Sequence, residues 1–275
     1  MKTFLRWAGG KQNLINDLLK HLPPNEKVNR YFEPFLGAAS LFFATEYKKC
    51  YLSDINRDLI NSYKSIKKNP EIVTELFNKH LHKFYKKKNY YYKIRDKFNN
   101  HKNNGTIEQA ARFIFLIHTS YNGIYRVNSS GKYNVPVGDK NPSFLTDEYL
   151  IEVSKKLLGT CISTKPYKRI KKLVKKGDLI YLDPPYPPLN GTSYFQHYTK
   201  DKFPENEQKK LATFANELTK KECFVMISNA DTSLIRELYN DWNIFEFKVT
   251  RCISSKKERM KVKELIITNY GPFGR

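Results

Sequence analysis

The sequence predicts an α/β fold, a doubly wound mixed sheet that carries an inserted helical and β-hairpin subdomain. Short, nearly continuous apolar runs recur along the chain and helical patterns follow them, which is typical of parallel strands covered on both faces by helices. A basic and aromatic stretch interrupts this pattern between about residues 58 and 145. Two β-like runs, joined by a basic and polar turn, close the chain and make the sheet mixed.

The individual elements follow from their local patterns. Four apolar runs predict strands: "RYFEPFL" (30–36), "CYLSDI" (50–55), "DLIYLD" (178–183) and "CFVMIS" (223–228). The segment 207–221 has apolar residues near helical spacing and predicts a crossover helix. The final runs, "NIFEFKVTRCI" and "VKELIITNY", predict two paired strands. Inside the basic stretch, "IEQAARFIFLIHTS" predicts a helix, and "GIYRVNSSGKYNVPVG" predicts a hairpin within 122–138.

The charge balance favours a polyanionic partner. The 275 residues include 49 basic and 27 acidic side chains, a formal net charge of +22 and a pI near 9.7. Phosphates attract Lys and Arg and release counterions on binding, and bases stack on aromatic rings, which make up 14% of this chain. Solvated lysine-rich faces would give the same excess, so the charge favours nucleic acid without establishing it.

Several classes of site are not indicated. The four cysteines are scattered without a C-x-x-C spacing: Cys50, Cys161, Cys223 and Cys252. This argues against a zinc site or a disulfide framework and fits a reducing compartment, and the histidines show no metal-ligand spacing. The N-terminus lacks the apolar core of a signal peptide, and no apolar run reaches the roughly 18 residues that span a bilayer. We therefore expect a cytoplasmic protein without metal or membrane anchor.

Two strand ends on the N-terminal side suggest a ligand site. In "YFEPFLGAAS" a strand runs into four small residues at 37–40, which would let a ligand approach the backbone or let a helix pack closely. The next strand ends in "LSDIN", with Asp54 about 20 positions after the glycine turn, the spacing that grips a ribose hydroxyl pair. Asp54 could equally cap the helix that follows. No P-loop motif is present, and "WAGGK" (7–11) reads on its own as a turn before a helix.

A third strand ends in "DPPY", residues 183–186, where open α/β sheets bind their ligands. Pro184 and Pro185 remove two N–H donors and fix φ, so this turn is rich in hydrogen-bond acceptors. The Asp183 carboxylate, a bare carbonyl and the Tyr186 ring suit an exocyclic amino group. The alternative is a rigid turn that caps a strand, although burying Asp183 there without a partner would be costly.

Taken with its neighbours, "DPPY" resembles the catalytic motif of S-adenosylmethionine-dependent DNA methyltransferases that modify N6 of adenine. The order of motifs is similar to that of the α group, and specifically the Dam-type family. The resemblance covers nearly the whole chain, in six blocks: "RWAGGK", "YFEPFLGAASLFF", "YNGIYRVNSSGKYNVPVG", "GDLIYLDPPYPPL", "MISNADT" and "ISSKKERMKVKELIITNY". It implies a Rossmann-like methyltransferase domain at 1–57 and 146–275, with a target-recognition subdomain at 58–145.

The resemblance also implies roles for individual residues. Catalysis would rest on Asp183, Pro184, Pro185 and Tyr186. The cofactor S-adenosyl-L-methionine would contact Trp7, Ala8, Gly9, Lys11, Glu33, Pro34, Phe35, Gly37, Asp54, Tyr167 and Asp183. Double-stranded DNA would contact Arg6, Asn122, Ile124, Arg126, Asn128 and Pro136, and Arg126 would read a guanine edge. The implied target is a GATC-like site. A cognate restriction endonuclease is an implied functional partner, and we expect a monomer or weak dimer.

The implied reaction begins with extrusion of the adenine, because a duplex hides its amino group. Asp183 and the Pro184 carbonyl would accept the two N6 hydrogens and localise the nitrogen lone pair for attack on the sulfonium methyl. The loop at 190–203 would bind phosphates and the opened strand.

Three positions depart from the family pattern: Ala39 replaces a frequent Gly, Pro166–Tyr167 replaces an Asp–Phe pair, and "VGDKNP" lacks an Arg–Tyr pair. The last departure weakens the GATC prediction, and loss of the Asp leaves stacking alone to hold the cofactor adenine. The alternatives are an N4-cytosine methyltransferase, which more often begins its motif with Ser, and a glutamine-directed protein methyltransferase, which usually has Asn there. An inactive DNA-binding relative is the third alternative, and a cofactor-binding assay separates it.

Overall fold

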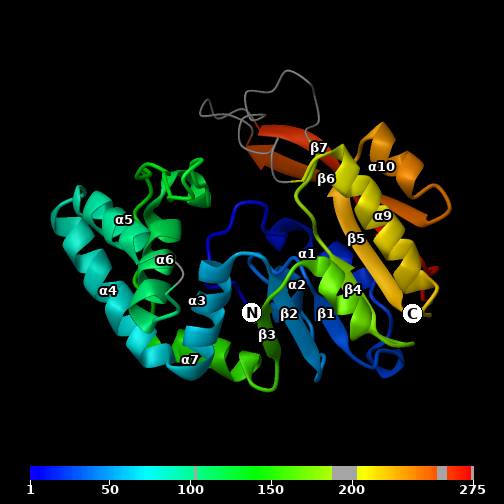
Figure 1. Ribbon diagram of the computed structural model, residues 1–275, viewed down its shortest axis with the longest axis horizontal. Coiled ribbons are helices and arrows are strands. Elements are labelled where there is room, and N and C mark those ends of the chain that lie inside the picture. The colour runs from blue at the N-terminus through cyan, green and yellow to red at the C-terminus, as the bar shows by residue number, and fades with distance from the viewer. Residues whose placement is uncertain (102–103, 188–202, 253–258, 274–275) are drawn as a thin grey trace. The chain divides into compact units, whose positions relative to one another are not determined.

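The computed structural model describes residues 1–101, 104–187, 203–252 and 259–273. Seven strands form one sheet in the order β3-β2-β1-β4-β5-β7-β6 (Figure 1). The strands are β1 (Tyr31–Glu33), β2 (Cys50–Asp54), β3 (Cys161–Thr164), β4 (Leu179–Leu182), β5 (Phe224–Ala230), β6 (Asn243–Cys252) and β7 (Arg259–Thr268). The pairs β1–β4 and β4–β5 are parallel, whereas β5–β7 and β6–β7 are antiparallel. This confirms the predicted α/β fold with a mixed sheet.

The strand predictions agree with the structure to within three residues at each end, apart from β3. Every residue of β4 is buried, and all but the first residue of β5 are buried, which is why both read as apolar runs. None of the four residues of β3 is fully buried, so its sequence carries no apolar run and the strand went unpredicted.

The chain divides into two compact units. One consists of Met1–Gly10, Leu36–Phe43 and Leu52–Pro166; the other consists of Lys11–Phe35, Ala44–Tyr51 and Tyr167–Arg275. We refer to them as the first unit and the second unit, and describe each by itself.

The first unit is largely helical. Its helices are α2 (Ser40–Ala44, whose last residue falls in the second unit), α3 (Arg57–Lys68), α4 (Pro70–Lys86), α5 (Tyr90–Asn100), α6 (Ile107–Thr119), the 3-10 turn η3 (Tyr121–Gly123) and α7 (Asp147–Leu157). Helix α6 packs against α3, α4 and α5, and most of its residues are buried. Thr106 begins α6, because its hydroxyl accepts a hydrogen bond from the Gln109 N–H at 3.2 Å. The predicted helix at 107–120 is therefore confirmed.

The predicted hairpin at 122–138 is present, but its pairing is sparse. Two isolated bridges, Val127↔Tyr133 and Ser120↔Val137, take the place of continuous strands. The Asn134 N–H donates to the Arg126 carbonyl at 3.2 Å, and the Asn128 N–H donates to the Lys132 carbonyl at 2.9 Å. A hairpin with so few bonds of its own needs support from the helices beside it.

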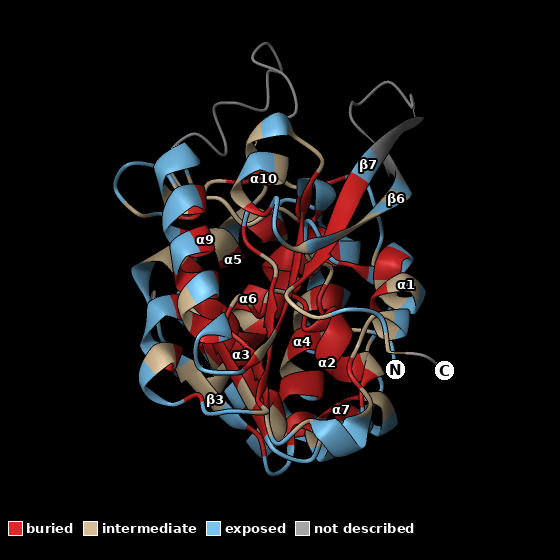
Figure 2. Ribbon diagram, turned by 90° about the vertical axis from the view of Figure 1, so that its right-hand side faces the viewer, coloured by how far each residue is buried: buried red, intermediate tan, exposed pale blue. Residues whose placement is uncertain are grey.

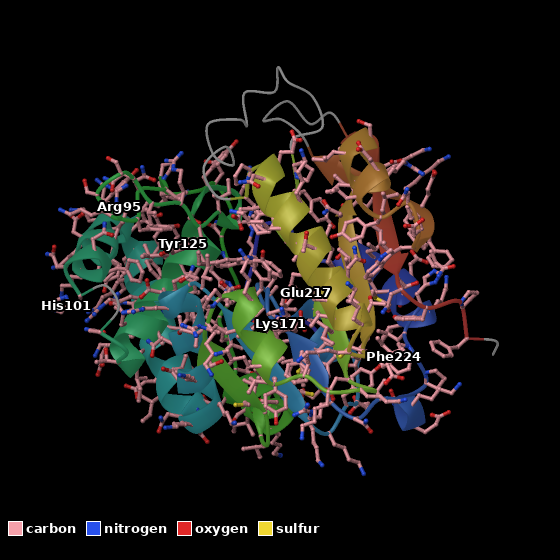
Figure 3. The ribbon with its side chains drawn as sticks, turned by 45° about the vertical axis from the view of Figure 1, so that its right-hand side comes forward. Arg95, His101, Tyr125, Lys171, Glu217 and Phe224 are labelled. Atoms are coloured by element: carbon pink, nitrogen blue, oxygen red, sulfur yellow. The ribbon has the colours of Figure 1, made fainter. Side chains whose placement is uncertain are left out.

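The second unit holds β1 and β4 to β7, including the edge strand β6, together with several helices. These helices are η1 (Gln12–Leu14), α1 (Ile15–Lys20), η2 (Asn25–Lys27), η4 (Tyr167–Lys172), α9 (Glu205–Thr219) and α10 (Ser233–Leu238). Helix α9, predicted at 207–221, lies along β5 (Figure 1). In Figure 2 the central strands are mostly buried, while exposed residues gather on α9 and α10. Lys171 of η4 and Glu217 of α9 form an ion pair at 2.8 Å on this surface (Figure 3).

Two predicted loops lie outside the described residues: 190–202 of the DNA-binding loop, and the turn between β6 and β7 at 253–258. Among the helices that the structure does describe, none is long and apolar enough to cross a membrane.

Candidate active site

The turn after β1 places a glycine against Trp7. Gly37 has a φ of +46°, and a Cβ added there would lie 3.2 Å from Trp7 Cδ1 and 3.3 Å from Trp7 Nε1. Its N–H donates to Asp54 Oδ2 at 3.2 Å, and its carbonyl accepts from the Tyr63 hydroxyl at 2.9 Å. Only a residue without a side chain combines this backbone conformation with this contact. Ala39, two residues on, also has a positive φ of +54°, so the departure from Gly is accommodated in a strained conformation.

Asp54 ends β2 with its carboxylate held by backbone donors. Besides Gly37, the Asn56 N–H donates to Oδ1 at 2.9 Å. Burial raises the pKa of Asp54, and the backbone N–H donors oppose that rise. Asp54 does not cap α3: the side chain of Asn56 does, accepting from the N–H groups of Asp58 and Leu59 at 3.0 and 3.1 Å. The capping alternative for Asp54 is therefore wrong, and its carboxylate accepts neutral donors.

Trp7 belongs to an aromatic group in the first unit. Its ring stacks on Tyr125 with centroids 6.0 Å apart, and Phe113 lies 6.1 Å away. The Gly10 N–H donates to the Trp7 carbonyl at 3.1 Å and closes a turn in which Ala8 and Gly9 are exposed. Trp7 thus touches both the Gly37 turn and the start of the hairpin.

The hairpin side chains predicted to read DNA also bond within the hairpin. Arg126 donates from Nε to Asn134 Oδ1 at 2.6 Å and from its Nη2 to the Asn134 carbonyl at 3.1 Å (the adjacent Tyr125 is labelled in Figure 3). Asn128 accepts the Lys132 N–H on its side-chain oxygen at 2.9 Å, which shapes the turn. Asn128 therefore has a structural task, and Arg126 is held in one orientation.

The entry to the hairpin packs against the N-terminal segment. Gly123 has a φ of +64°, and a Cβ there would lie 2.6 Å from the Arg6 carbonyl, so this contact requires glycine. Asn122 has a φ of +52°, which asparagine tolerates, and it is exposed. Ile124 and Pro136 contribute their carbonyls, which accept from the Tyr133 hydroxyl at 3.2 Å and the Tyr121 N–H at 3.0 Å. Burial lowers the pKa of Arg6.

Helix α5 supplies the support that the sparse hairpin needs. Tyr91 donates from its hydroxyl to the Val135 carbonyl at 2.8 Å, and Arg95 donates to the same carbonyl at 3.4 Å. The Asn99 side chain forms two hydrogen bonds with the backbone of Tyr133: its amide N–H donates to the carbonyl at 3.0 Å, and its oxygen accepts from the N–H at 2.7 Å. Figure 3 labels Arg95 on this helix. No local sequence pattern predicts these contacts, because they join residues more than 30 positions apart.

In the second unit, Asp183 follows β4 in a polar cluster. Lys11 Nζ lies 2.9 Å from Asp183 Oδ1, and the Ser228 hydroxyl donates to the same oxygen at 3.1 Å. Ser228 is itself 2.6 Å from the Tyr181 hydroxyl. Burial raises the pKa of Asp183, while the Lys11 ammonium and the Ser228 hydroxyl oppose this. The structure thus brings together two predicted residues, Lys11 and Asp183, and adds Ser228 and Tyr181.

Tyr186 completes this cluster. Lys11 Nζ lies 4.6 Å from the centroid of the Tyr186 ring, and the Tyr186 hydroxyl donates to Glu264 Oε2 at 2.9 Å. Burial and the nearby Asp183 and Glu264 carboxylates raise the pKa of Tyr186 well above its usual range. Glu264 was missed by sequence reasoning, although it lies in a block that carries the family resemblance.

The proline pair is fixed from α9. Gln208 donates to the Pro185 carbonyl at 3.0 Å, and its own oxygen accepts from Asn229 of β5 at 3.1 Å. Pro184 is buried, and none of the residues that the structure describes donates to its carbonyl. The turn therefore has a rigid backbone and presents acceptors, as predicted from its two prolines.

The remaining predicted cofactor residues lie around β1. Glu33 is buried and accepts from the Tyr31 hydroxyl at 2.7 Å, and Pro34 is buried beside it. The Phe35 ring stacks on Tyr167 with centroids 5.2 Å apart and planes inclined by 26°. These two rings form an aromatic pair, and burial together with the nearby Glu207 carboxylate raises the pKa of Tyr167. Over the described parts of the chain, no cluster of His, Cys, Asp and Glu could hold a metal ion.

Comparison with known proteins bears directly on this arrangement. A family model described as D12 class N6 adenine-specific DNA methyltransferase matches residues 7–253. "Type II methyltransferase M1.LlaDCHI" of Lactococcus lactis subsp. cremoris is 37% identical, over 98% of this chain and 96% of that protein. "Type II methyltransferase M.MjaIII" of Methanocaldococcus jannaschii is also 37% identical, over 98% and 99%. "DNA adenine methylase" of Escherichia coli (strain K12) is 34% identical, over 96% and 94%.

These matches confirm the resemblance that the motifs predicted. Since the family match and the relatives each extend over most of the chain, this protein belongs to the D12 class of N6 adenine-specific DNA methyltransferases and is an enzyme that methylates adenine N6 in DNA.

Proposed function

We propose that this enzyme takes its methyl group from S-adenosyl-L-methionine and transfers it to an adenine flipped out of double-stranded DNA, with Asp183 at the reacting nitrogen. One observation carries the proposal: the turn after β4 has two acceptors on adjacent residues, the Asp183 carboxylate and the Pro184 carbonyl, on a backbone that Gln208 holds through Pro185. An exocyclic amino group offers two donors that match such a pair.

The chemistry follows from the state of that amino group. The N6 lone pair of adenine is delocalised into the ring, which makes the nitrogen a poor nucleophile. Two acceptors that each take one N6 hydrogen favour a more tetrahedral nitrogen and localise the lone pair. Asp183 does this as a carboxylate, which the Lys11 ammonium at 2.9 Å helps to keep ionised. When bound, the cofactor supplies a methyl on a good leaving group, so the enzyme contributes mainly alignment.

The cofactor contacts are proposed residue by residue. Asp54 would accept the ribose hydroxyls, because its carboxylate is held by neutral N–H donors and no Lys or Arg among the described residues forms an ion pair with it. Gly37 would allow close approach to the backbone, with Trp7 against it. The other proposed contacts are Ala8, Gly9, Lys11, Glu33, Pro34, Phe35 and Tyr167, with the Phe35–Tyr167 pair offering the aromatic surface for the adenine.

DNA recognition is proposed for the hairpin and Arg6, within a target-recognition subdomain at 58–145. Asn134 orients the Arg126 guanidinium, which suits a side chain that must meet one guanine edge in a fixed direction. Asn122, Ile124, Asn128 and Pro136 would complete the surface. We propose a GATC-like target from the family resemblance of the hairpin, and a functional partnership with a restriction endonuclease, supported by relatives named type II methyltransferases.

The test compares Asp183→Ala with Asp241→Ala, an exposed aspartate of the same unit. Transfer of a tritiated methyl group from S-adenosylmethionine to unmethylated duplex DNA should be abolished in the first variant and unchanged in the second. Calorimetric titration should show that Asp183→Ala keeps at least part of its cofactor binding, although Asp183 is also one of the expected cofactor contacts. Turnover retained in Asp183→Ala would refute the assignment, and methylation-aware sequencing of DNA from expressing cells would give the target sequence.

A further inference from the structure

Glu264 is a buried carboxylate with no role in the proposed function. It lies on β7, opposite Ala230 of β5 and Phe247 of β6, and only 4% of its surface is exposed. Its Oε2 accepts the Tyr186 hydroxyl proton at 2.9 Å. Burying a carboxylate is costly, so one that is held against the tyrosine of the "DPPY" turn calls for an explanation beyond packing.

The surroundings of Glu264 form one charged cluster around the Tyr186 ring. Lys11, 8% exposed, contacts the Asp183 carboxylate at 2.9 Å, and its Nζ lies 4.6 Å from the centre of the ring. The Glu264 carboxylate acts on two groups here, since it raises the pKa of both Asp183 and Tyr186. The ring thus has a cation over its face and a carboxylate at its hydroxyl.

A phenol hydroxyl that donates to a carboxylate changes the charge distribution of its aromatic ring. The anion draws the phenol proton and leaves more negative charge on the oxygen and, through conjugation, on the ring. The face of such a ring attracts a cation more strongly, and Lys11 shows that this face accepts one. In methyl transfer the sulfonium loses its positive charge and the attacking N6 gains it, until N6 releases a proton.

We propose that Glu264 is a positioning residue for methyl transfer: it fixes Tyr186 through its hydroxyl and polarises the ring, so that the ring stabilises the positive charge developing on the target nitrogen. This rests on the proposed function, in which Asp183 lies at the reacting nitrogen, and on the catalytic role that the family resemblance implies for Tyr186 in the same turn. Methyl transfer would then require a negative charge at residue 264, which the "DPPY" motif and its prolines do not supply.

The decisive variant is Glu264→Gln, which keeps an acceptor for the Tyr186 hydroxyl and removes the charge. The single-turnover methylation rate at saturating DNA and cofactor should fall roughly tenfold, because loss of the charge weakens a desolvated cation–π interaction without abolishing it, while KM for both substrates stays within about twofold. Glu264→Ala also removes the acceptor for the Tyr186 hydroxyl, so its methylation rate should fall further than that of Glu264→Gln. The control is Glu246→Gln, an exposed carboxylate on β6 paired with Lys263, which should leave the rate unchanged.

A double-mutant cycle separates this role from a structural one. Tyr186→Phe lacks the hydroxyl, so it should itself slow the rate roughly tenfold, and adding Glu264→Gln to it should cause no further loss. Additive losses in the double variant would overturn the proposal, as would a wild-type rate in a folded Glu264→Gln. If Glu264→Gln does not fold, Tyr186→Phe decides alone: an unchanged rate overturns the proposal and a tenfold loss supports it.

Asp183→Ala, measured in parallel, distinguishes a failure of the proposed function from a failure of the role proposed for Glu264. If it retains turnover, the proposed function fails and the inference falls with it. If it is inactive while the Glu264 variants match the wild type, the proposed function stands and only the role of Glu264 is overturned.

Discussion

Gly37 offers a direct test of how the turn after β1 is built. The change Gly37→Ala adds one methyl group at a φ of +46°, where its Cβ would meet Trp7 at 3.2 and 3.3 Å. Two effects then combine. A non-glycine residue in the left-handed region is strained, and a contact this short forces the indole or the turn to shift.

The magnitude follows from treating the two effects separately. Left-handed strain costs about 1–2 kcal/mol, and the smaller entropy of the unfolded alanine chain returns roughly 0.4–1 kcal/mol of it. Overpacking against Trp7 adds about 1–3 kcal/mol. The net loss in free energy of unfolding should therefore be about 1–5 kcal/mol, with a fall in Tm of about 2–4 °C for each kcal/mol in a chain of this size.

Two matched variants isolate these terms. Gly159 has a φ of +74° with nothing within 4 Å of an added Cβ, so Gly159→Ala measures strain alone and should cost roughly 1 kcal/mol. Ala39→Gly relieves strain in the same turn at a φ of +54° and should leave stability within about 1 kcal/mol of wild type.

The assay is thermal unfolding followed by circular dichroism, with cofactor titration of each folded variant. Because the Gly37 N–H donates to Asp54, a shifted turn should also weaken S-adenosylmethionine binding in Gly37→Ala and leave it unchanged in Gly159→Ala. The reasoning is refuted if Gly37→Ala is no less stable than Gly159→Ala, since the contact with Trp7 would then carry no energy.

Two further predictions concern Asp54 and Asn99. Burial raises the pKa of Asp54, so cofactor affinity should fall as the pH drops through that raised pKa, because the protonated carboxyl loses an acceptor. Asp54→Asn should bind the cofactor weakly and without this fall at low pH. Calorimetry at several pH values tests this, and a fall that persists in Asp54→Asn would contradict it. Asn99→Ala removes both bonds to Tyr133 and should loosen the hairpin by about 1–3 kcal/mol, weakening binding of target duplex in fluorescence anisotropy. The neighbouring exposed Asn100→Ala should bind as wild type, and equal binding by both variants would contradict the support from α5.

The part of the fold that could be predicted is the part whose burial is uniform along the chain. β4 and β5 are almost wholly buried, so they read as apolar runs with turn signals at their ends. β3 is half-exposed at the edge of the sheet and left no such pattern. The hairpin was predictable from its turn residues, but its pairing was not, because Tyr91 and Asn99 of α5 supply bonds that a strand partner would otherwise make.

The same distinction separates the site residues that were found from those that were missed. Asp183 stands at a strand end before two prolines, a local signal. Glu264 has no local signal: its partner Tyr186 is 78 positions away, and the antiparallel pairing of β7 with β5 brings its strand next to that of Ser228. Contacts made by sheet topology cannot be read from spacing along the chain.

Asp54 and Asp183 show what even a correct residue prediction leaves open. Both end a strand, and burial raises the pKa of both. Asp54 accepts two backbone N–H groups, neutral donors that leave its carboxylate suited to neutral hydroxyls. Asp183 contacts an ammonium and a serine hydroxyl, which oppose the rise in its pKa and hold it in one orientation. One sequence signal, an aspartate at a strand end, therefore yields two different chemistries, because the partners that the fold brings to each carboxylate differ.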